Sequence, residues 1–134
     1  MEAPKLTLRV EFGSGRALGA GKIRLLEAID KTGSISAAGR SLRMSYRRAW
    51  LLAHDINNCF GDPVIEIQLG GAKKGATLAP LGKRLIERYR AIETEALIAT
   101  SKHLHEIKAS LKGTKASRPL TSIRRPLRIA TGPR

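Results

Sequence analysis

Aromatic residues and cysteine are both scarce in this chain of 134 residues. Aromatic residues make up only 4% of the sequence, as two Phe, two Tyr and one Trp. So few rings cannot form a surface on which successive bases of a single strand stack. The single cysteine, Cys59, can form neither an internal disulfide nor a multi-cysteine zinc site. We therefore expect a protein of a reducing, cytoplasmic compartment, with no structural metal and no cofactor.

The sequence also lacks a long apolar run. No window approaches the roughly 18 apolar residues that a membrane span requires. Residues 1–5 have neither the basic start nor the apolar stretch of a secretory signal. We therefore expect no membrane segment.

Acidic residues are far outnumbered by basic ones. There are 11 Asp and Glu residues against 25 Lys and Arg, which gives a formal net charge of +14. Such an excess usually matches a polyanionic partner, and nucleic acid is the leading candidate. Residues 113–134 contribute six basic residues, three prolines and no acidic residue, so residues 1–112 retain +8 without them. We predict a folded domain over 1–112 and a flexible basic tail over 113–134.

The spacing of apolar residues predicts one strand and three helices in the first half of the chain. Residues 6–12 alternate apolar and polar side chains, the period of a half-buried strand, and residues 13–15 end it. Helical spacing follows over 21–32, with Gly33 as a stop signal. Ser34 can cap a short helix over 35–42, and Ser45 can cap a third helix that ends at 61–63. The predicted inward face of the third helix consists of Ala49, Leu52, Ala53, Ile56 and Phe60.

The second half predicts a hairpin and a long helix. Two short apolar strands, at 64–67 and 76–78, flank a glycine-rich basic turn that contains Lys73 and Lys74. Pro80 suits the first position of a last helix that extends to about Leu111. This helix has two neighbouring apolar lines, so we expect a homodimer through the 81–111 helix.

This order of elements predicts an α+β, mainly α fold: a winged helix-turn-helix with a long C-terminal dimerisation helix. The second helix of the helix-turn-helix, which Ser45 caps, would enter the major groove of double-stranded DNA. Arg47 would point away from the inward face and read guanine, while Arg48 could clamp a phosphate. Ser45 and Tyr46 could bond phosphates or bases, and Lys73 and Lys74 of the wing could contact the backbone or the minor groove. An ordinary solvated helix face is the structural alternative for the arginine pair.

Several strings of the sequence also resemble a known family. They are Gly-Ser-Ile-Ser at 33–36, Ser-Tyr-Arg-Arg-Ala-Trp at 45–50, the glycine pair at 70–71 and Leu-Gly-Lys-Arg-Leu at 81–85. Together they resemble the N-terminal DNA-binding domain of ModE-type molybdate-responsive regulators, over roughly residues 5–100. The LysR-type helix-turn-helix is similar more loosely, through Ala38, Leu42 and Ser45.

The resemblance implies a dimeric transcription factor that binds a palindromic operator. The residues that match the family's recognition helix are Ser45, Tyr46, Arg47 and Arg48, and Ser34 and Ser36 in the first string join the predicted DNA contacts. Full-length family members continue into oxyanion-binding domains. This chain has a helix end and a basic tail there, so we do not expect it to bind molybdate or tungstate.

Three alternatives remain beside a sequence-specific, nucleoid-associated regulator. One is an architectural protein that binds DNA without choosing sequence. Another is an interaction module whose last helix docks a partner or an anionic membrane surface. A third is an oxyanion sensor that acts through this chain. We expect no enzyme, because no nucleophile and base, phosphate-binding loop or metal-ligand spacing is recognisable.

Overall fold

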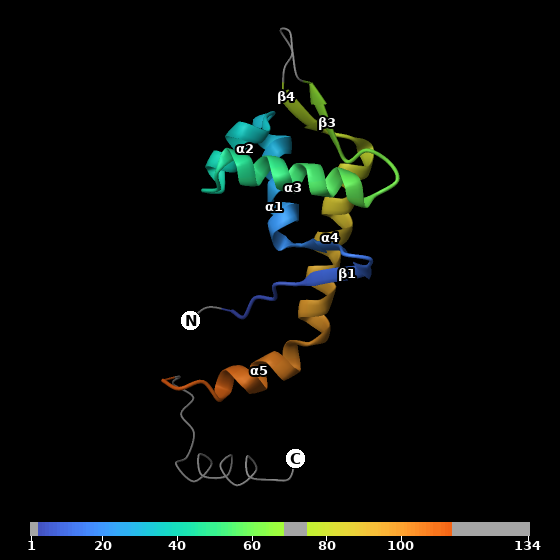
Figure 1. Ribbon diagram of the computed structural model, residues 1–134. Coiled ribbons are helices and arrows are strands. Elements are labelled where there is room, and N and C mark those ends of the chain that lie inside the picture. The colour runs from blue at the N-terminus through green and yellow to red at the C-terminus, as the bar shows by residue number, and fades with distance from the viewer. Residues whose placement is uncertain (1–2, 69–74, 114–134) are drawn as a thin grey trace. The chain divides into compact units, whose positions relative to one another are not determined.

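The computed structural model describes residues 3–68 and 75–113 (Figure 1). The chain divides into two compact units. One is Leu6–Glu95, and the other includes the described residues 3–5 and 96–113.

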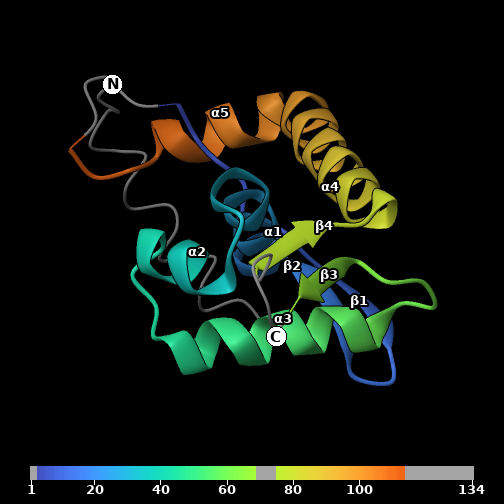
Figure 2. The ribbon, with the colours of Figure 1, turned by 90° about the horizontal axis from the view of Figure 1, so that it is seen from above.

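The unit Leu6–Glu95 begins with a hairpin of β1 (Arg9–Gly13) and β2 (Arg16–Gly19). Three helices follow, α1 (Ala20–Thr32), α2 (Ile35–Ser41) and α3 (Tyr46–Cys59). A second hairpin of β3 (Ile65–Gln68) and β4 (Gly75–Leu78) precedes α4 (Pro80–Ala99). Both hairpins are antiparallel, and in the second Ile65 pairs with Leu78 and Ile67 with Ala76. Figure 2 shows α2 and α3 next to each other, with the second hairpin nearby.

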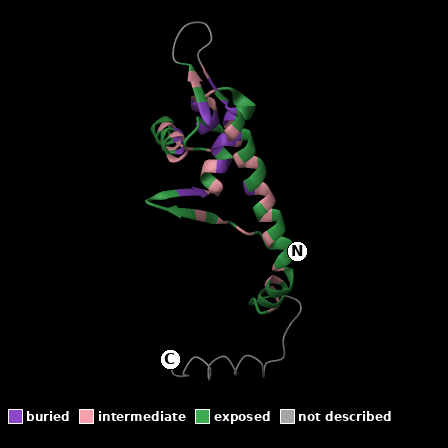
Figure 3. Cartoon of the chain, turned by 90° about the vertical axis from the view of Figure 1, so that its right-hand side faces the viewer, coloured by how far each residue is buried: buried purple, intermediate pink, exposed green. Residues whose placement is uncertain are grey.

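The core of this unit is filled by side chains from all three N-terminal helices, both hairpins and α4. Its fully buried members include Ile23, Leu25, Leu26, Ile29, Ala38, Ala49, Ala53, Ile56 and Val64. Figure 3 shows that buried residues are concentrated in this unit. Small residues allow α2 and α3 to approach closely, since a Cβ added at Gly39 would lie 3.0 Å from the Cβ of Ala49. The helix pair is thereby held as a rigid block.

The local signals at the helix ends act as predicted. Gly33 adopts a left-handed conformation with φ 80°, and its N–H donates to the carbonyl of Ile29. Ser34 Oγ accepts from Ala37 N at 2.9 Å, and Ser45 Oγ accepts from Arg48 N at 3.1 Å. Pro80 is the first residue of α4. The predicted helix-turn-helix and hairpin boundaries are confirmed to within one or two residues.

The first hairpin corrects the prediction for the N-terminus. The predicted strand over 6–12 begins only at Arg9, and β2, which the pattern did not predict, pairs with it. Ala17 and Leu18 of β2 are both buried, so this strand lacks the alternation that marks a half-buried strand. Phe12 is 54% exposed and makes an edge contact with the Phe60 ring, 6.5 Å between centroids.

The predicted single helix over 81–111 is wrong. The structure has α4, then Thr100, then α5 (Ser101–Ala109). Thr100 has φ −106° and ψ 7°, and its hydroxyl donates to the carbonyl of Ala96 at 2.7 Å. A hydroxyl that bonds back to the preceding turn competes with the helix ladder and bends it, which explains the interruption.

The second unit contains the end of α4 and α5, and none of the residues in α5 is buried. Leu97, Ile98, Ile107 and Leu111 are exposed at 37%, 69%, 63% and 55%. Within the described parts of the chain, no helix has the length and apolar character needed to cross a bilayer.

Candidate nucleic-acid interface

Helix α3 has one face in the core and one in solvent. Ala49, Ala53 and Ile56 have no exposed surface. The first turn of the helix is exposed, and it carries Tyr46, Arg47 and Arg48. The predicted orientation of Arg47 away from the core is consistent with this arrangement. Leu52 and Phe60, predicted to face inward, are half-buried at the edge of the core.

The segment around this turn is basic. Residues 31–54 contain five basic residues and no acidic one, and the basic residues are all exposed: Lys31, Arg40, Arg43, Arg47 and Arg48. In the described ranges, none of the salt bridges involves Arg47 or Arg48. The first carboxylate further along α3, Asp55, is bound by Lys22 Nζ at 2.7 Å. The two guanidinium groups are therefore available to an external anion.

The turn between α2 and α3 is fixed by the backbone. Met44 N–H donates to the carbonyl of Gly39 at 2.9 Å, and Arg43 adopts a left-handed conformation with φ 60°. This conformation sends the chain back toward Ser45, which starts α3. The predicted helix-turn-helix geometry results from these contacts together with the packing of Gly39 on Ala49.

The second hairpin is attached to the helices at two points. Asn57 of α3 binds the start of β3, with Nδ2 donating to Ile65 O and Oδ1 accepting from Val64 N and Ile65 N, at 2.9 to 3.0 Å. Ala76 N of β4 donates to Gly33 O at 2.9 Å. These bonds fix the positions of β3 and β4, the two strands of the wing, relative to the helices. Lys73 and Lys74, predicted to contact DNA, lie outside the described residues.

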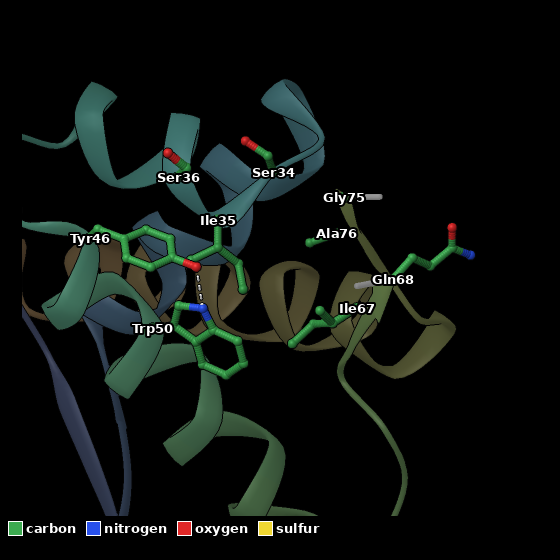
Figure 4. A pocket seen from close by; sticks show the side chains of 9 residues that line it. All are labelled: Ser34, Ile35, Ser36, Tyr46, Trp50, Ile67, Gln68, Gly75 and Ala76. Carbon is green, nitrogen blue, oxygen red and sulfur yellow. Dashed lines mark hydrogen bonds between the residues drawn. The ribbon is translucent and has the colours of Figure 1, made fainter. Parts of the chain in front are cut away.

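A hollow of about 460 Å³ lies between α2, the start of α3 and the wing strands (Figure 4). Ser34 and Ser36 from α2 and its cap, Tyr46 and Trp50 from α3, and Gln68 from β3 line it, with Ile35, Ile67, Gly75 and Ala76. Three of the eight predicted contacts, Ser34, Ser36 and Tyr46, therefore line one concave surface. Arg47, Arg48 and Ser45 line a second, neighbouring depression on α3.

Sequence reasoning missed Trp50, Gln68 and Asn57 as parts of this region. Trp50 Nε1 donates a hydrogen bond to Tyr46 Oη, one turn earlier on α3 (Figure 4). The spacing of four residues between the two rings could have indicated this pair. Gln68 and Asn57 depend on contacts between distant segments, for which the sequence gives no local signal.

An ion pair joins α1 and α4. Arg90 of α4 donates to both carboxylate oxygens of Glu27 of α1, at 2.9 and 2.8 Å, and to Glu93 at 2.6 Å. The hydrogen bonds from Arg90 lower the pKa of Glu27, and the two carboxylates raise the pKa of Arg90. Tyr89 is almost fully buried, its hydroxyl donates to Leu8 O at 2.6 Å, and desolvation raises its pKa. The described residues include no group of three or more His, Cys, Asp and Glu that could hold a metal ion.

Helices α1 to α3, followed by the β3–β4 hairpin and α4, make this chain a winged helix-turn-helix protein. No protein-family model matches the chain. It is 46% identical over 81 residues to the molybdenum-pterin-binding protein MopB of Rhodobacter capsulatus, covering 60% of this chain and 30% of that protein. It is 39% identical over 113 residues to the molybdenum transport protein ModE of Azotobacter vinelandii, covering 80% of this chain and 42% of that protein. The transcriptional regulator ModE of Haemophilus influenzae is 28% identical over 94 residues, covering 69% of this chain and 37% of that protein.

These similarities confirm the predicted resemblance to ModE-type regulators. The chain spans less than half the length of each of these relatives. Among solved structures, a LysR family transcriptional regulator is similar over 61% of this chain and 27% of its own, with 11% sequence identity and a TM-score of 0.47.

Proposed function

We propose that the chain is a sequence-specific regulator of transcription that places α3 in the major groove of double-stranded DNA. The observation that carries this proposal is the exposed first turn of α3, where Arg47 lies opposite the fully buried Ala49, Ala53 and Ile56 and Arg48 lies on a flank. In helix-turn-helix proteins the N-terminal residues of the second helix contact the base edges. The similarity to ModE of Haemophilus influenzae, which is named a transcriptional regulator, supports the same class of function.

The two arginines would divide the work of recognition. The guanidinium of Arg47 can donate two hydrogen bonds to guanine O6 and N7, which discriminates against other bases by roughly 1–3 kcal/mol. The guanidinium of Arg48 can bind a phosphate of the DNA backbone. Phosphate contacts supply affinity without sequence preference. Lys73 and Lys74, in the segment that joins β3 to β4, would add contacts to the backbone or the minor groove.

We also propose that the protein acts as a homodimer. The part of the chain predicted to pair, 81–111, exposes the apolar side chains of Ile92, Leu97, Ile98, Ile107 and Leu111. Burial of such side chains against a second copy would remove apolar surface from water, and a two-fold dimer matches a palindromic operator. Sedimentation equilibrium of the whole chain tests this, and a monomer at micromolar concentration opposes it.

Selection of bound fragments from a random duplex pool tests the main proposal. The expected result is an enriched sequence that the chain binds more tightly than random duplex at the same salt concentration. Arg47→Ala should then relax preference at one or two base positions. A matched control, Arg16→Ala, removes the same charge from an exposed position on the first hairpin and should leave the preference intact. Equal losses on enriched and random duplex from Arg47→Ala would contradict the assignment of Arg47.

The same pool separates the proposal from architectural binding. A protein that binds DNA only through its charge would enrich no sequence and would bind every duplex with a similar, salt-dependent affinity. That outcome would replace sequence-specific regulation with a packaging role.

A further inference from the structure

Four hydroxyl groups near the start of α2 and α3 act as hydrogen-bond acceptors. Each accepts a hydrogen bond from a donor within this chain. Ser34 Oγ accepts from Ala37 N at 2.9 Å, Ser36 Oγ from Arg40 Nη1 at 2.9 Å, and Ser45 Oγ from Arg48 N at 3.1 Å. Tyr46 Oη accepts from Trp50 Nε1.

Four hydroxyls elsewhere in the described residues donate their proton within the chain. Thr32, Ser41, Thr100 and Tyr89 each donate to a backbone carbonyl, at 2.6 to 2.8 Å. A hydroxyl has one proton to donate and two lone pairs to accept with. Each of the four hydroxyls near α2 and α3 uses one lone pair to accept a bond from this chain. Its proton can then be donated to an acceptor outside the chain.

Three of the residues that carry these hydroxyls, Ser34, Ser36 and Tyr46, are among those that line one hollow (Figure 4). We propose that this hollow binds one phosphodiester group of the DNA backbone, with Tyr46 as a donor to it and Trp50 as the residue that positions Tyr46. This inference rests on the proposed function, because it names the part of the DNA that the hollow takes.

The donor pattern favours phosphate over a base edge. Non-bridging phosphate oxygens only accept hydrogen bonds, whereas base edges present acceptors and donors together. Hydroxyl groups on three residues that line one hollow match an acceptor-only group. The exposed guanidinium of Arg40, which already binds Ser36 Oγ, adds positive charge beside them. The absence of acidic residues over 31–54 leaves no internal carboxylate from this segment to compete.

Trp50 acts on the phosphate through Tyr46. Its indole N–H occupies a lone pair of the phenol oxygen, which directs the phenolic proton away from the indole. Trp50 is half-buried and lies one turn after Tyr46, so the pair is held by the helix itself. Loss of the indole N–H would leave the phenol in place with its proton free to point elsewhere.

The experiment compares Tyr46→Phe, Trp50→Phe and the double variant, with fluorescence anisotropy on enriched and random duplexes. Tyr46→Phe should weaken binding about tenfold on both duplexes, since a hydrogen bond to a charged group is lost. The slope of affinity against salt should not change, because no charge is removed. Trp50→Phe should weaken binding less, and the double variant should bind no more weakly than Tyr46→Phe.

Tyr89→Phe is the matched control, because Tyr89 is the other tyrosine of the sequence and is buried away from solvent. It should lower the melting temperature and leave the DNA affinity of the folded protein unchanged. Tyr46→Phe should lower the DNA affinity and leave the melting temperature unchanged. A duplex with a neutral methylphosphonate at single positions should show one position where the wild type loses affinity and Tyr46→Phe does not.

The outcomes separate this inference from the proposed function. If the wild-type chain binds no duplex, both fail. If it binds an enriched duplex and Tyr46→Phe binds equally well, or loses affinity only at particular base pairs, the phosphodiester assignment alone is overturned. If inorganic phosphate raises the melting temperature of the wild type but not of Tyr46→Phe at concentrations that do not displace DNA, the hollow binds a free anion and the backbone assignment fails.

Discussion

The side-chain amide of Asn57 in α3 binds both backbone groups of Ile65 in β3. Nδ2 donates to Ile65 O and Oδ1 accepts from Ile65 N, each at 2.9 Å, and Oδ1 also accepts from Val64 N. One half-buried side chain therefore fixes the first strand of the wing against the proposed recognition helix. The position of the wing depends on a contact that is local to neither element.

Asn57→Ala should lower the free energy of unfolding by about 2–3 kcal/mol, because three hydrogen bonds are lost and backbone groups next to the core lose their partner. Asn57→Asp is the matched control. It keeps an acceptor for the two N–H groups and replaces the donor to Ile65 O with a carboxylate oxygen, so any stability that it retains over Asn57→Ala comes from the two bonds to Oδ1. Urea unfolding followed by circular dichroism measures both. Unfolding of Asn57→Ala at the wild-type urea midpoint would show that the amide does not hold the strand.

Two glycines in helices should respond in opposite directions to the same substitution. A Cβ at Gly82 in α4 would lie 2.5 Å from Val64 O, whereas a Cβ at Gly21 in α1 would meet nothing within 4 Å. Gly82→Ala should therefore destabilise the protein by about 2 kcal/mol or more, since backbone must move. Gly21→Ala should stabilise it by up to about 1 kcal/mol, because alanine favours the helix. Equal melting temperatures for the two variants would contradict the close approach of α4 to Val64.

The parts of the fold that sequence predicted are those with local causes. Ser34 and Ser45 each cap a helix through a bond to a backbone N–H three residues on, and Gly33 ends α1 through its own conformation. The exposed arginines of α3 follow from helical spacing alone. Such signals lie within one or two turns of the chain, so the sequence contains them in readable form.

The parts that sequence missed depend on distant segments or on a competing local bond. β2 is buried on adjacent residues, Ala17 and Leu18, because it packs against α1 as well as β1. Asn57 acquires its role only when β3 reaches α3. The break at Thr100 has a local cause, but its apolar neighbours continue the helical period and conceal it. Periodicity reports which face is apolar and not whether the backbone is continuous.

The wing should be sensitive to one glycine at its return strand. A Cβ at Gly75 would lie 2.7 Å from Gly33 O, the same carbonyl that accepts from Ala76 N. Gly75→Ala should push β4 away from the α1–α2 turn and weaken binding to enriched and random duplex alike, while the base preference assigned to Arg47 is retained. Anisotropy on both duplexes measures this. Full affinity in a variant with a lowered melting temperature would show that the wing is not part of the interface.

The ion pair between Glu27 and Arg90 should make stability depend on acid pH. Arg90 lowers the pKa of Glu27 below its ordinary value of 4.5, so folding favours the ionised carboxylate. A carboxylate with a lowered pKa contributes stability above the ordinary value, and that contribution is lost as the pH falls through the folded value. Because the side chains are 38% and 39% exposed, the contribution at neutral pH should stay within about 1 kcal/mol.

Glu27→Gln should therefore be less stable than the wild type at pH 7, and the two should converge as the pH falls below 4.5. Glu11→Gln is the control for the loss of one negative charge, since Glu11 pairs with Arg9 through side chains that are 72% and 65% exposed. It should lose less stability at pH 7, because water screens that pair more strongly. Urea unfolding at several pH values measures the differences. A Glu27→Gln variant that stays less stable by the same amount at pH 3 would show that the carboxylate acts through packing and not through its charge.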